Sequence, residues 1–173
     1  MTENDICIGL PAQIDAACRV LVLGSMPGSA SLQQAQYYAH PRNRFWPLMA
    51  HVCGVDAQAP YPQRLRALQM AGIGLWDVIG RCERRGSLDA AIVRGTEVPN
   101  PLADVLAGLP RLALVACNGA TAHQAYQRHV APALTCAVPV LALPSTSPAN
   151  AAFSLDRLRQ AWQPVADALA ETR

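Results

Sequence analysis

Short apolar runs alternate along this chain with segments whose apolar residues recur at helical spacing. The first run lies within residues 19–24, is apolar from Val20 to Leu23 and ends at a glycine. Such continuous apolarity suits a strand of a parallel sheet, buried on both faces. Similar runs occur at residues 73–79, 112–117 and 138–143. We therefore predict four strands.

Three segments between or after these runs have the spacing of amphipathic helices. One begins at Phe45, one at Tyr61, and a third follows Ser154, which is a good N-cap residue. The third carries an apolar stripe up to Leu169, and Pro164 should bend it. Strands that alternate with helices predict an α/β fold with three layers, α/β/α, around a central four-stranded, mainly parallel sheet.

Composition is consistent with one folded domain over residues 1–173, because 51% of residues are hydrophobic and only 15% are charged. No apolar run reaches the roughly 18 residues of a bilayer span, and the first five residues carry acid rather than base. We expect a cytoplasmic protein with no membrane partner. The six cysteines form no C-x-x-C pair, so we expect buried thiols, no metal and no cofactor.

All 14 basic residues counted as Lys or Arg are arginines. Arginine binds phosphate through a planar fork, although a genome rich in GC would produce the same bias. A phosphate-binding rim could therefore form from Arg42, Arg44, Arg81, Arg84 and Arg85. Without lysine, no side chain can form a Schiff base with a sugar aldehyde.

The carboxyl ends of parallel strands are where such sheets bind ligands. The first strand leads into Gly24-Ser25-Met26-Pro27-Gly28, which matches neither phosphate-binding glycine motif and no nucleophile elbow. This loop either offers backbone groups to a ligand or is a plain turn. The other strands lead to Trp76-Asp77, Asn118 and residues 144–150.

Residues 37–46 combine four aromatic rings, two arginines, an amide and an imidazole. Aromatic rings stack on bases, arginines bind phosphates and amides bind base edges, so this mixture suits an unstacked nucleotide. Simpler roles also remain open, since Phe45 and Trp46 could anchor the following helix and His40 could belong to a turn.

Four motifs together resemble the uracil-DNA glycosylase superfamily, and most closely its hypoxanthine-DNA (deoxyinosine) glycosylase family. They are G-S-M-P-G at 24–28, Y-Y-x-x-P-x-N-x-F-W at 37–46, G-L-W-D-V at 74–78 and L-P-S-T-S-P-A at 143–149. The resemblance implies a monomeric DNA-repair enzyme of the bacterial cytosol that acts on chromosomal DNA. Such an enzyme flips a deaminated base out of DNA and hydrolyses its N-glycosidic bond without cutting the strand.

The resemblance also implies residue roles. Asn43 would be catalytic, positioning water or polarising the base. The base would contact Ser25, Met26, Pro27, Gly28, Tyr38, His40, Phe45, Trp76, Asp77 and Asn118. DNA would contact Arg42, Arg44, Pro144, Ser145, Thr146 and Ser147, with a phosphate on Ser145.

Three positions depart from the superfamily pattern. Met26 replaces the asparagine of the mismatch-specific uracil branch, and Leu143 stands where histidine or asparagine is frequent. We therefore expect hypoxanthine to be the chief substrate, with weaker activity on uracil or xanthine. Ser147 replaces the wedge leucine of relatives, which leaves strand separation unexplained.

Two other functions stay open on these residues. One is a catalytically weak or inactive nucleic-acid binding module, which the departures at Met26 and Leu143 favour. The other is a small hydrolase of nucleotides or esters that activates water through His40 or Asp77. Asp77 could equally be a capping or turn residue.

Overall fold

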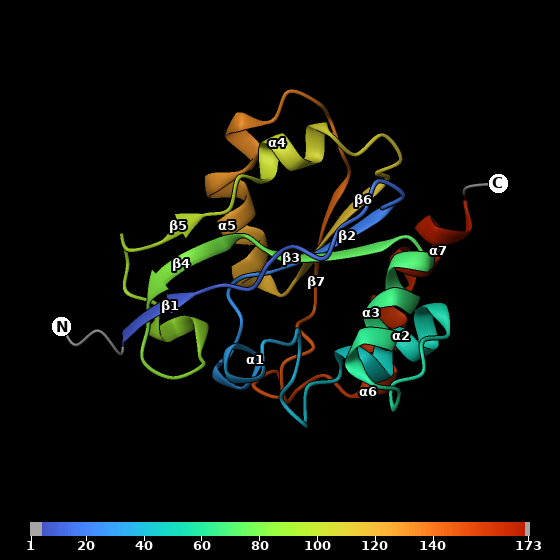
Figure 1. The fold of residues 1–173 in the computed structure, drawn as a ribbon, viewed down its shortest axis with the longest axis horizontal. Coiled ribbons are helices and arrows are strands. Elements are labelled where there is room, and N and C mark those ends of the chain that lie inside the picture. The colour runs from blue at the N-terminus through green and yellow to red at the C-terminus, as the bar shows by residue number, and fades with distance from the viewer. Residues whose placement is uncertain (1–4, 172–173) are drawn as a thin grey trace.

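The computed structural model describes residues 5–171, which form two sheets flanked by helices (Figure 1). Four parallel strands have the order β3-β2-β6-β7, and three antiparallel strands have the order β1-β4-β5. The strands are β1 (Ile6–Ile8), β2 (Val20–Gly24), β3 (Ile73–Asp77), β4 (Ile79–Glu83), β5 (Val98–Pro99), β6 (Leu114–Asn118) and β7 (Val140–Leu143). The α-helices are α1 (Ser29–Gln34), α2 (Phe45–Cys53), α3 (Tyr61–Met70), α4 (Leu102–Ala107), α5 (Ala120–His129), α6 (Leu155–Ala161) and α7 (Gln163–Ala170). Two short 3-10 helices are η2 (Asp89–Ala91) and η3 (Ala131–Ala133).

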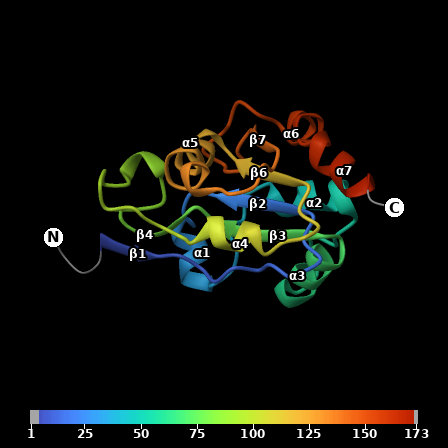
Figure 2. The same cartoon turned by 90° about the horizontal axis from the view of Figure 1, so that it is seen from above.

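Strand β2 lies at the centre of the parallel sheet and is buried along its whole length. Successive side chains of a strand point to opposite faces. Val20 and Val22 accordingly pack in a core with residues of α2, α3, α6 and α7. Leu21 and Leu23 pack in a second core with residues of α4 and α5. Figures 1 and 2 show these two groups of helices on opposite sides of the sheet, so the predicted three-layer fold is confirmed.

The apolar run at residues 73–79 forms two strands rather than one. β3 ends at Asp77, and the chain then leaves the parallel sheet to enter β4, which pairs antiparallel with β1 and β5. The N–H of Val78 still donates to the carbonyl of Gly24 at 2.9 Å, and that of Ile79 donates to Ser25 at 3.0 Å. Apolar residues continue on both sides of Asp77 because both halves of the run are buried, which is why its pattern predicts one strand rather than two.

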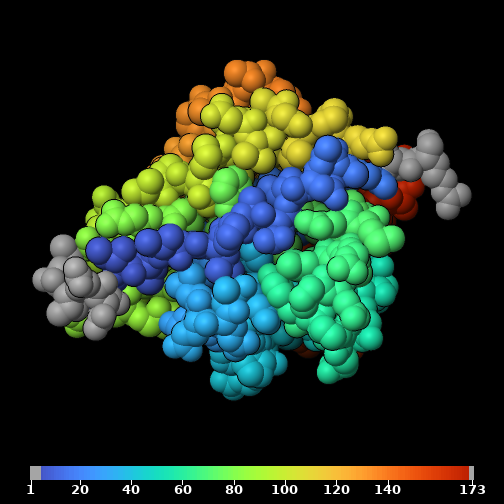
Figure 3. All heavy atoms as spheres, in the orientation of Figure 1, coloured from blue at the N-terminus to red at the C-terminus, as the bar shows by residue number. Residues whose placement is uncertain are grey.

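The free edge of β3 is covered by the segment that follows β1. Gln13 and Leu75 exchange two backbone hydrogen bonds, of 2.9 and 3.0 Å, in an antiparallel bridge. Figure 3 shows this N-terminal segment running across the surface of the molecule. Covered edges prevent pairing with other chains, so the parallel sheet does not present β3 to solvent.

The predicted C-terminal helix is divided into α6 and α7 at Trp162. The hydroxyl of Ser154 accepts from the N–H of Arg157 at 3.2 Å, as expected of an N-cap. Pro164 lies in the first turn of α7, where its missing N–H is tolerated. Trp162 is fully buried, and its indole N–H donates to the carbonyl of Pro144 at 2.9 Å. The C-terminal segment therefore holds the loop after β7.

Arg44 holds the same loop from the other side. Its backbone N–H donates to Thr146 at 3.1 Å, and Nη2 of its guanidinium donates to the carbonyls of Ser147 and Asn150 at 2.8 and 3.0 Å. Nη1 donates to the carbonyl of Phe153. The guanidinium is thus bonded to protein carbonyls, which gives no support to the prediction that Arg44 binds DNA.

Replacing Arg44 with Met is expected to lower the free energy of unfolding by about 2 kcal/mol or more, because the carbonyls of the loop lose their charged donor. Urea denaturation would measure this loss. Arg42→Met is the matched control, since Arg42 is exposed and its side chain makes no hydrogen bond within the described residues. Equal stability of the two variants would contradict this role of Arg44.

Candidate active site

The register of the parallel sheet brings four strand ends into one row. Gly24 at the end of β2 is paired with Asp77 at the end of β3, and Asn118 at the end of β6 is paired with Leu143 at the end of β7. Leu23 is paired with Cys117, so Gly24 and Asn118 follow side by side. Residues that are up to 119 positions apart in the chain therefore meet at one edge.

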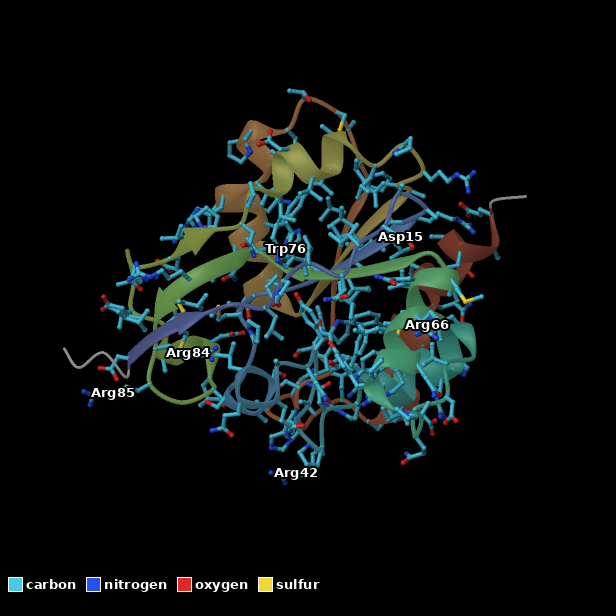
Figure 4. All side chains as sticks on the ribbon, viewed as in Figure 1. Asp15, Arg42, Arg66, Trp76, Arg84 and Arg85 are labelled. Carbon is cyan, nitrogen blue, oxygen red and sulfur yellow. The ribbon has the colours of Figure 1, made fainter. Side chains whose placement is uncertain are left out.

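A pocket of about 990 Å³ opens at this edge. Its volume lies near the top of the range of roughly 300–1,000 Å³ that is typical of small-molecule sites. Besides the strand ends, its walls come from residues 24–31, from the segment around Tyr38 and Asn43, from residues 87–90 and from residues 142–150. Arg42 belongs to its rim and extends into solvent (Figure 4).

Gly24 leaves room for the carboxyl group of Asp77 at the floor of the pocket. A methyl group at position 24 would collide with Oδ1 of Asp77 and would stand 3.6 Å from the hydroxyl oxygen of Tyr38. Glycine is therefore required here by a close approach of two side chains to the backbone. The carboxyl of Asp77 and the phenol of Tyr38 both border this point of the floor.

Two buried polar atoms of the floor have no hydrogen-bond partner among the described residues. They are Oδ2 of Asp77 and the hydroxyl of Tyr38. Buried polar atoms are nearly always paired, and both of these belong to residues that line the pocket, where a ligand or water could pair them. Burial raises the pKa of Asp77 to about 7, with a further rise from Asp89 and an opposing effect of Arg84. Burial, and then Asp77, raise the pKa of the Tyr38 phenol, while the nearby amide of Asn118 opposes this rise.

Tyr38 has a left-handed backbone conformation, with φ of 56°. Such a conformation costs a non-glycine residue about 1 kcal/mol or more and persists only when neighbours enforce it. The indole N–H of Trp46 donates to the carbonyl of Tyr37 at 3.1 Å, and the N–H of Ala39 donates to the hydroxyl of Ser31 at 3.1 Å. The ring of Phe45 stacks on that of Tyr38, with centroids 4.1 Å apart. These contacts hold the phenol in place.

The side-chain amide of Asn43, which lines the pocket, has a defined orientation. Oδ1 accepts the N–H of Phe45 at 2.9 Å, just at the start of α2. An N–H group can only donate, so this bond identifies the oxygen and leaves the amide nitrogen on the other side. That nitrogen has no hydrogen-bond partner within the part of the chain that the structure describes. Asn43 thus offers the pocket a neutral donor.

Asn118 and Thr146 join the floor to the loop after β7. Nδ2 of Asn118 donates to the hydroxyl of Thr146, and the N–H of Thr146 donates to Oδ1 of Asn118, both at 3.0 Å. Thr146 is fully buried. The amide of Asn118 therefore serves first to hold the loop, and Thr146 lies beneath the surface that DNA would meet.

The segment that follows β4 supports the pocket loop, a role that the sequence did not predict: it suggested Arg84 only as part of a phosphate-binding rim and gave no role to Asp89. Arg84 is only 2% exposed, and its guanidinium donates to the carbonyl of Pro27 at 2.6 Å. Asp89 accepts the hydroxyl of Ser25 at 2.7 Å. Burial raises the pKa of Asp89, while the bond from Ser25 opposes this rise. No periodicity in the sequence marks these residues, because they meet the loop only through the bend between β3 and β4.

The predicted phosphate-binding rim of arginines is not formed. Arg84 is buried under the pocket loop, whereas Arg85 pairs with Asp5 at 3.2 Å, away from the pocket (Figure 4). Arg81 is exposed on β4 but does not line the pocket, and Arg44 holds the loop after β7. Arg42 alone of these five arginines lies at the pocket.

Phe45 and Trp76 do not line the pocket either, so the structure gives no support to the prediction that they contact a base. Phe45 has no exposed surface and acts through its stacking on Tyr38. The indole N–H of Trp76 donates to the carbonyl of Leu10 at 3.2 Å, and its ring packs in the core beside α4 and α5. The other predicted residues do line it: Ser25, Met26, Pro27, Gly28, Tyr38, His40, Arg42, Asn43, Asp77, Asn118, Pro144, Ser145, Thr146 and Ser147.

His40 lies exposed at the rim of the pocket, where its Nδ1 accepts the N–H of Arg42 at 3.1 Å, as in a turn. Met26 and Leu143 are buried and give the pocket two apolar wall positions. Within residues 5–171 no three His, Cys, Asp or Glu side chains gather as metal ligands. In the same range, none of the helices has the length and apolarity needed to span a bilayer.

Comparison with known proteins places this fold and pocket in a family. The model of the uracil DNA glycosylase superfamily matches residues 11–167. A protein of Methanosarcina acetivorans named hypoxanthine DNA glycosylase is 36% identical over 166 residues, which cover 91% of this chain and 96% of the relative. One of the same name from Methanosarcina barkeri is 41% identical over 112 residues, 64% of this chain and 70% of the relative.

A solved structure agrees with these relatives. The solution NMR structure of a protein from Methanosarcina acetivorans, described provisionally as a uracil DNA glycosylase, superposes with a TM-score of 0.80 at 33% identity. The match covers 96% of this chain and 99% of the other. The chain therefore belongs to the uracil DNA glycosylase superfamily.

Proposed function

We propose that this protein is a DNA glycosylase that removes deaminated bases from DNA, with hypoxanthine as its chief substrate. The observation that carries the proposal is a pocket whose lining residues Tyr38, Asp77 and Asn43 each carry a polar atom without a hydrogen-bond partner among the described residues. Membership of the superfamily supports the reaction, and the two archaeal relatives named hypoxanthine DNA glycosylases support the base.

The floor of the pocket recognises the polar edge of an everted base. In its neutral form the Asp77 carboxyl can donate a hydrogen bond to a base carbonyl and accept one from a ring N–H. The Tyr38 phenol adds a second donor beside it. Hypoxanthine carries a carbonyl at C6 next to an N–H at N1, which matches this pair of groups, whereas adenine has an amino group in place of the carbonyl.

Asn43 stabilises the departing base. When water attacks C1′ of the sugar, the bond to N9 breaks, its electron pair stays on the base, and the proton of the water is lost to solvent or to the released base. A donor aimed at the developing anion lowers the barrier. The free amide nitrogen of Asn43 suits this role better than positioning water through Oδ1, because Oδ1 is bonded to the N–H of Phe45.

The pocket depends on neutral donors, since Met26 and Leu143 supply no acid or amide at two positions of its wall. Hypoxanthine spreads the negative charge onto its carbonyl oxygen, so such donors suffice. The absence of lysine excludes a Schiff base with the opened sugar from any side chain. Water is then the nucleophile, and the abasic strand is left uncut.

Oligonucleotides that carry inosine, uracil or xanthine test the proposal directly. We expect strand breaks at inosine only after alkali treatment, with slower release of uracil and xanthine. Breaks without alkali would contradict a monofunctional enzyme. Tight binding without any break would instead support an inactive nucleic-acid binding module, and hydrolysis of free nucleotides or esters would support the hydrolase alternative.

Asn43→Ala is expected to slow single-turnover excision by roughly 10²–10³-fold, as for other lost transition-state donors. Asn43→Asp separates chemistry from structure, because it keeps an acceptor for the N–H of Phe45 but loses the donor. Asn43→Asp should therefore melt close to the wild-type temperature and still lose excision. If it excised inosine at the wild-type rate, the donor role of Asn43 would be wrong.

Excision is expected to slow as the pH rises from about 6 to about 9, because ionised Asp77, with its pKa about 7, repels the departing anion. Single-turnover rates across this range measure the effect. Asp77→Asn keeps a neutral donor, so its profile should be flat over the same range. A profile that keeps its wild-type shape in Asp77→Asn would refute the assignment.

The same carboxyl links stability to pH. Its pKa in the fold lies above the unfolded value of about 3.9, so its contribution to stability is complete below that pH and is lost as the pH rises toward about 7. Asp77→Asn should consequently gain stability relative to the wild type at neutral and alkaline pH. Thermal denaturation at acidic and alkaline pH provides this control.

A further inference from the structure

One large apolar side chain at the mouth of the pocket is left exposed. Leu88 is 59% exposed and lines the pocket beside Ser87 and Asp89. It packs in none of the three apolar cores of the described residues. The other exposed large apolar residues in this part of the chain do not line the pocket; they are Ile6, Ile8, Met70, Val93 and Val98.

The two neighbours of Leu88 are tied to the pocket loop. The hydroxyl of Ser87 accepts the N–H of Ser29 at 2.9 Å, and Asp89 accepts the hydroxyl of Ser25 at 2.7 Å. The segment lies beside α1 at the strand-end edge of the molecule (Figure 1). Leu88 therefore points outward between two residues that are hydrogen-bonded to the pocket loop and to α1. Its backbone is fixed by these bonds, unlike that of a loop without such contacts.

The backbone adds to this rigidity. Leu88 is extended and begins the short helix η2, where its carbonyl accepts the N–H of Ala91 at 3.0 Å. Arg84 binds the carbonyl of Pro27 from beneath, so a third bond joins the segment to the loop. The loop that contacts the base and the residue beside it thus form one unit.

An everted base leaves a gap in the duplex, and proteins that distort DNA often fill such gaps with an apolar side chain. The side chains that the loop after β7 contributes to the pocket are small or at least partly buried: Pro144, Ser145, Thr146, Ser147, Pro148, Ala149, Asn150 and Phe153. Phe153, the one large apolar side chain among them, is half-buried, packs against the core of α2, α6 and α7, and lies under the guanidinium of Arg157 at 4.3 Å. A wedge must be apolar, exposed, rigidly held and next to the mouth of the pocket. Leu88 meets all four conditions.

We propose that Leu88 is the wedge that enters the duplex when the base enters the pocket. The inference rests on the proposed function. Leu88 contacts neither the reacting atoms nor the base. It fills the space that the flipped base leaves in the duplex and so opposes the return of the nucleotide to the stack. Its contribution should be greatest where the duplex is most stable, and absent where there is no duplex.

Leu88→Ala tests the proposal on inosine placed in a duplex and in the identical single strand. We expect excision from the duplex opposite cytosine to slow by roughly tenfold or more, and excision from the single strand to stay within about twofold. The loss should be smaller opposite a poorly pairing base, and Leu88→Met should restore most of the duplex rate. Equal slowing on both substrates would place Leu88 against the base and overturn the proposal, as would no slowing on either.

Val93→Ala is the matched control, because Val93 is also exposed and apolar but lies outside the pocket. It should leave both rates unchanged, and an equal effect of the two variants would overturn the proposal. A 2-aminopurine next to inosine gives a readout independent of excision. Its fluorescence should rise on binding of the wild type and much less with Leu88→Ala. If the wild type excises no base, the proposed function fails, and the fluorescence difference alone supports or overturns the wedge.

Discussion

A parallel sheet that is covered on both faces tolerates polar side chains only where its strands end. In this protein β2 is apolar and buried from its first residue, and the polar groups of the sheet appear at Asp77 and Asn118. The register places these strand ends in one row. The same burial of both sheet faces that excludes polar side chains from the strands therefore gathers them at one edge, where the site forms. Glycine at the end of β2 then leaves space for a carboxyl group.

That carboxyl is costly for the fold. Within residues 5–171, the buried Oδ2 of Asp77 and the phenol of Tyr38 have no hydrogen-bond partner, and Tyr38 adopts a strained backbone conformation. Such features persist only where surrounding contacts impose them, and they concentrate at functional sites. The aromatic contacts of Phe45 and Trp46 supply that support. The fold thus holds the Asp77 carboxyl and the Tyr38 phenol in positions where a base could form hydrogen bonds with them.

The loops around the pocket are held mainly by bonds between side chains and the backbone. Arg44 and Trp162 bind the loop after β7, while Arg84 binds the loop after β2. Arginine suits the first place because its planar fork reaches three carbonyls there, those of Ser147, Asn150 and Phe153, whereas Arg84 donates to the single carbonyl of Pro27. A high arginine content therefore does not by itself predict phosphate binding, since only Arg42 of the five arginines proposed for the phosphate-binding rim lies at the pocket.

The sequence by itself predicted the three layers, the positions of the parallel strands and the loops that follow them at one edge, whereas the roles of single pocket residues came from the family resemblance. Those features depend on local apolar periodicity and on the rule that parallel strands end at one edge. The roles of Arg44, Phe45, Trp76 and Arg84 were decided only by the tertiary structure, because the exposure of a side chain depends on what packs against it. The bend between β3 and β4 is also not predicted by the run at residues 73–79, in which only Asp77 is polar and apolar residues continue on both sides of it, and that bend brings Leu88 and Asp89 to the pocket.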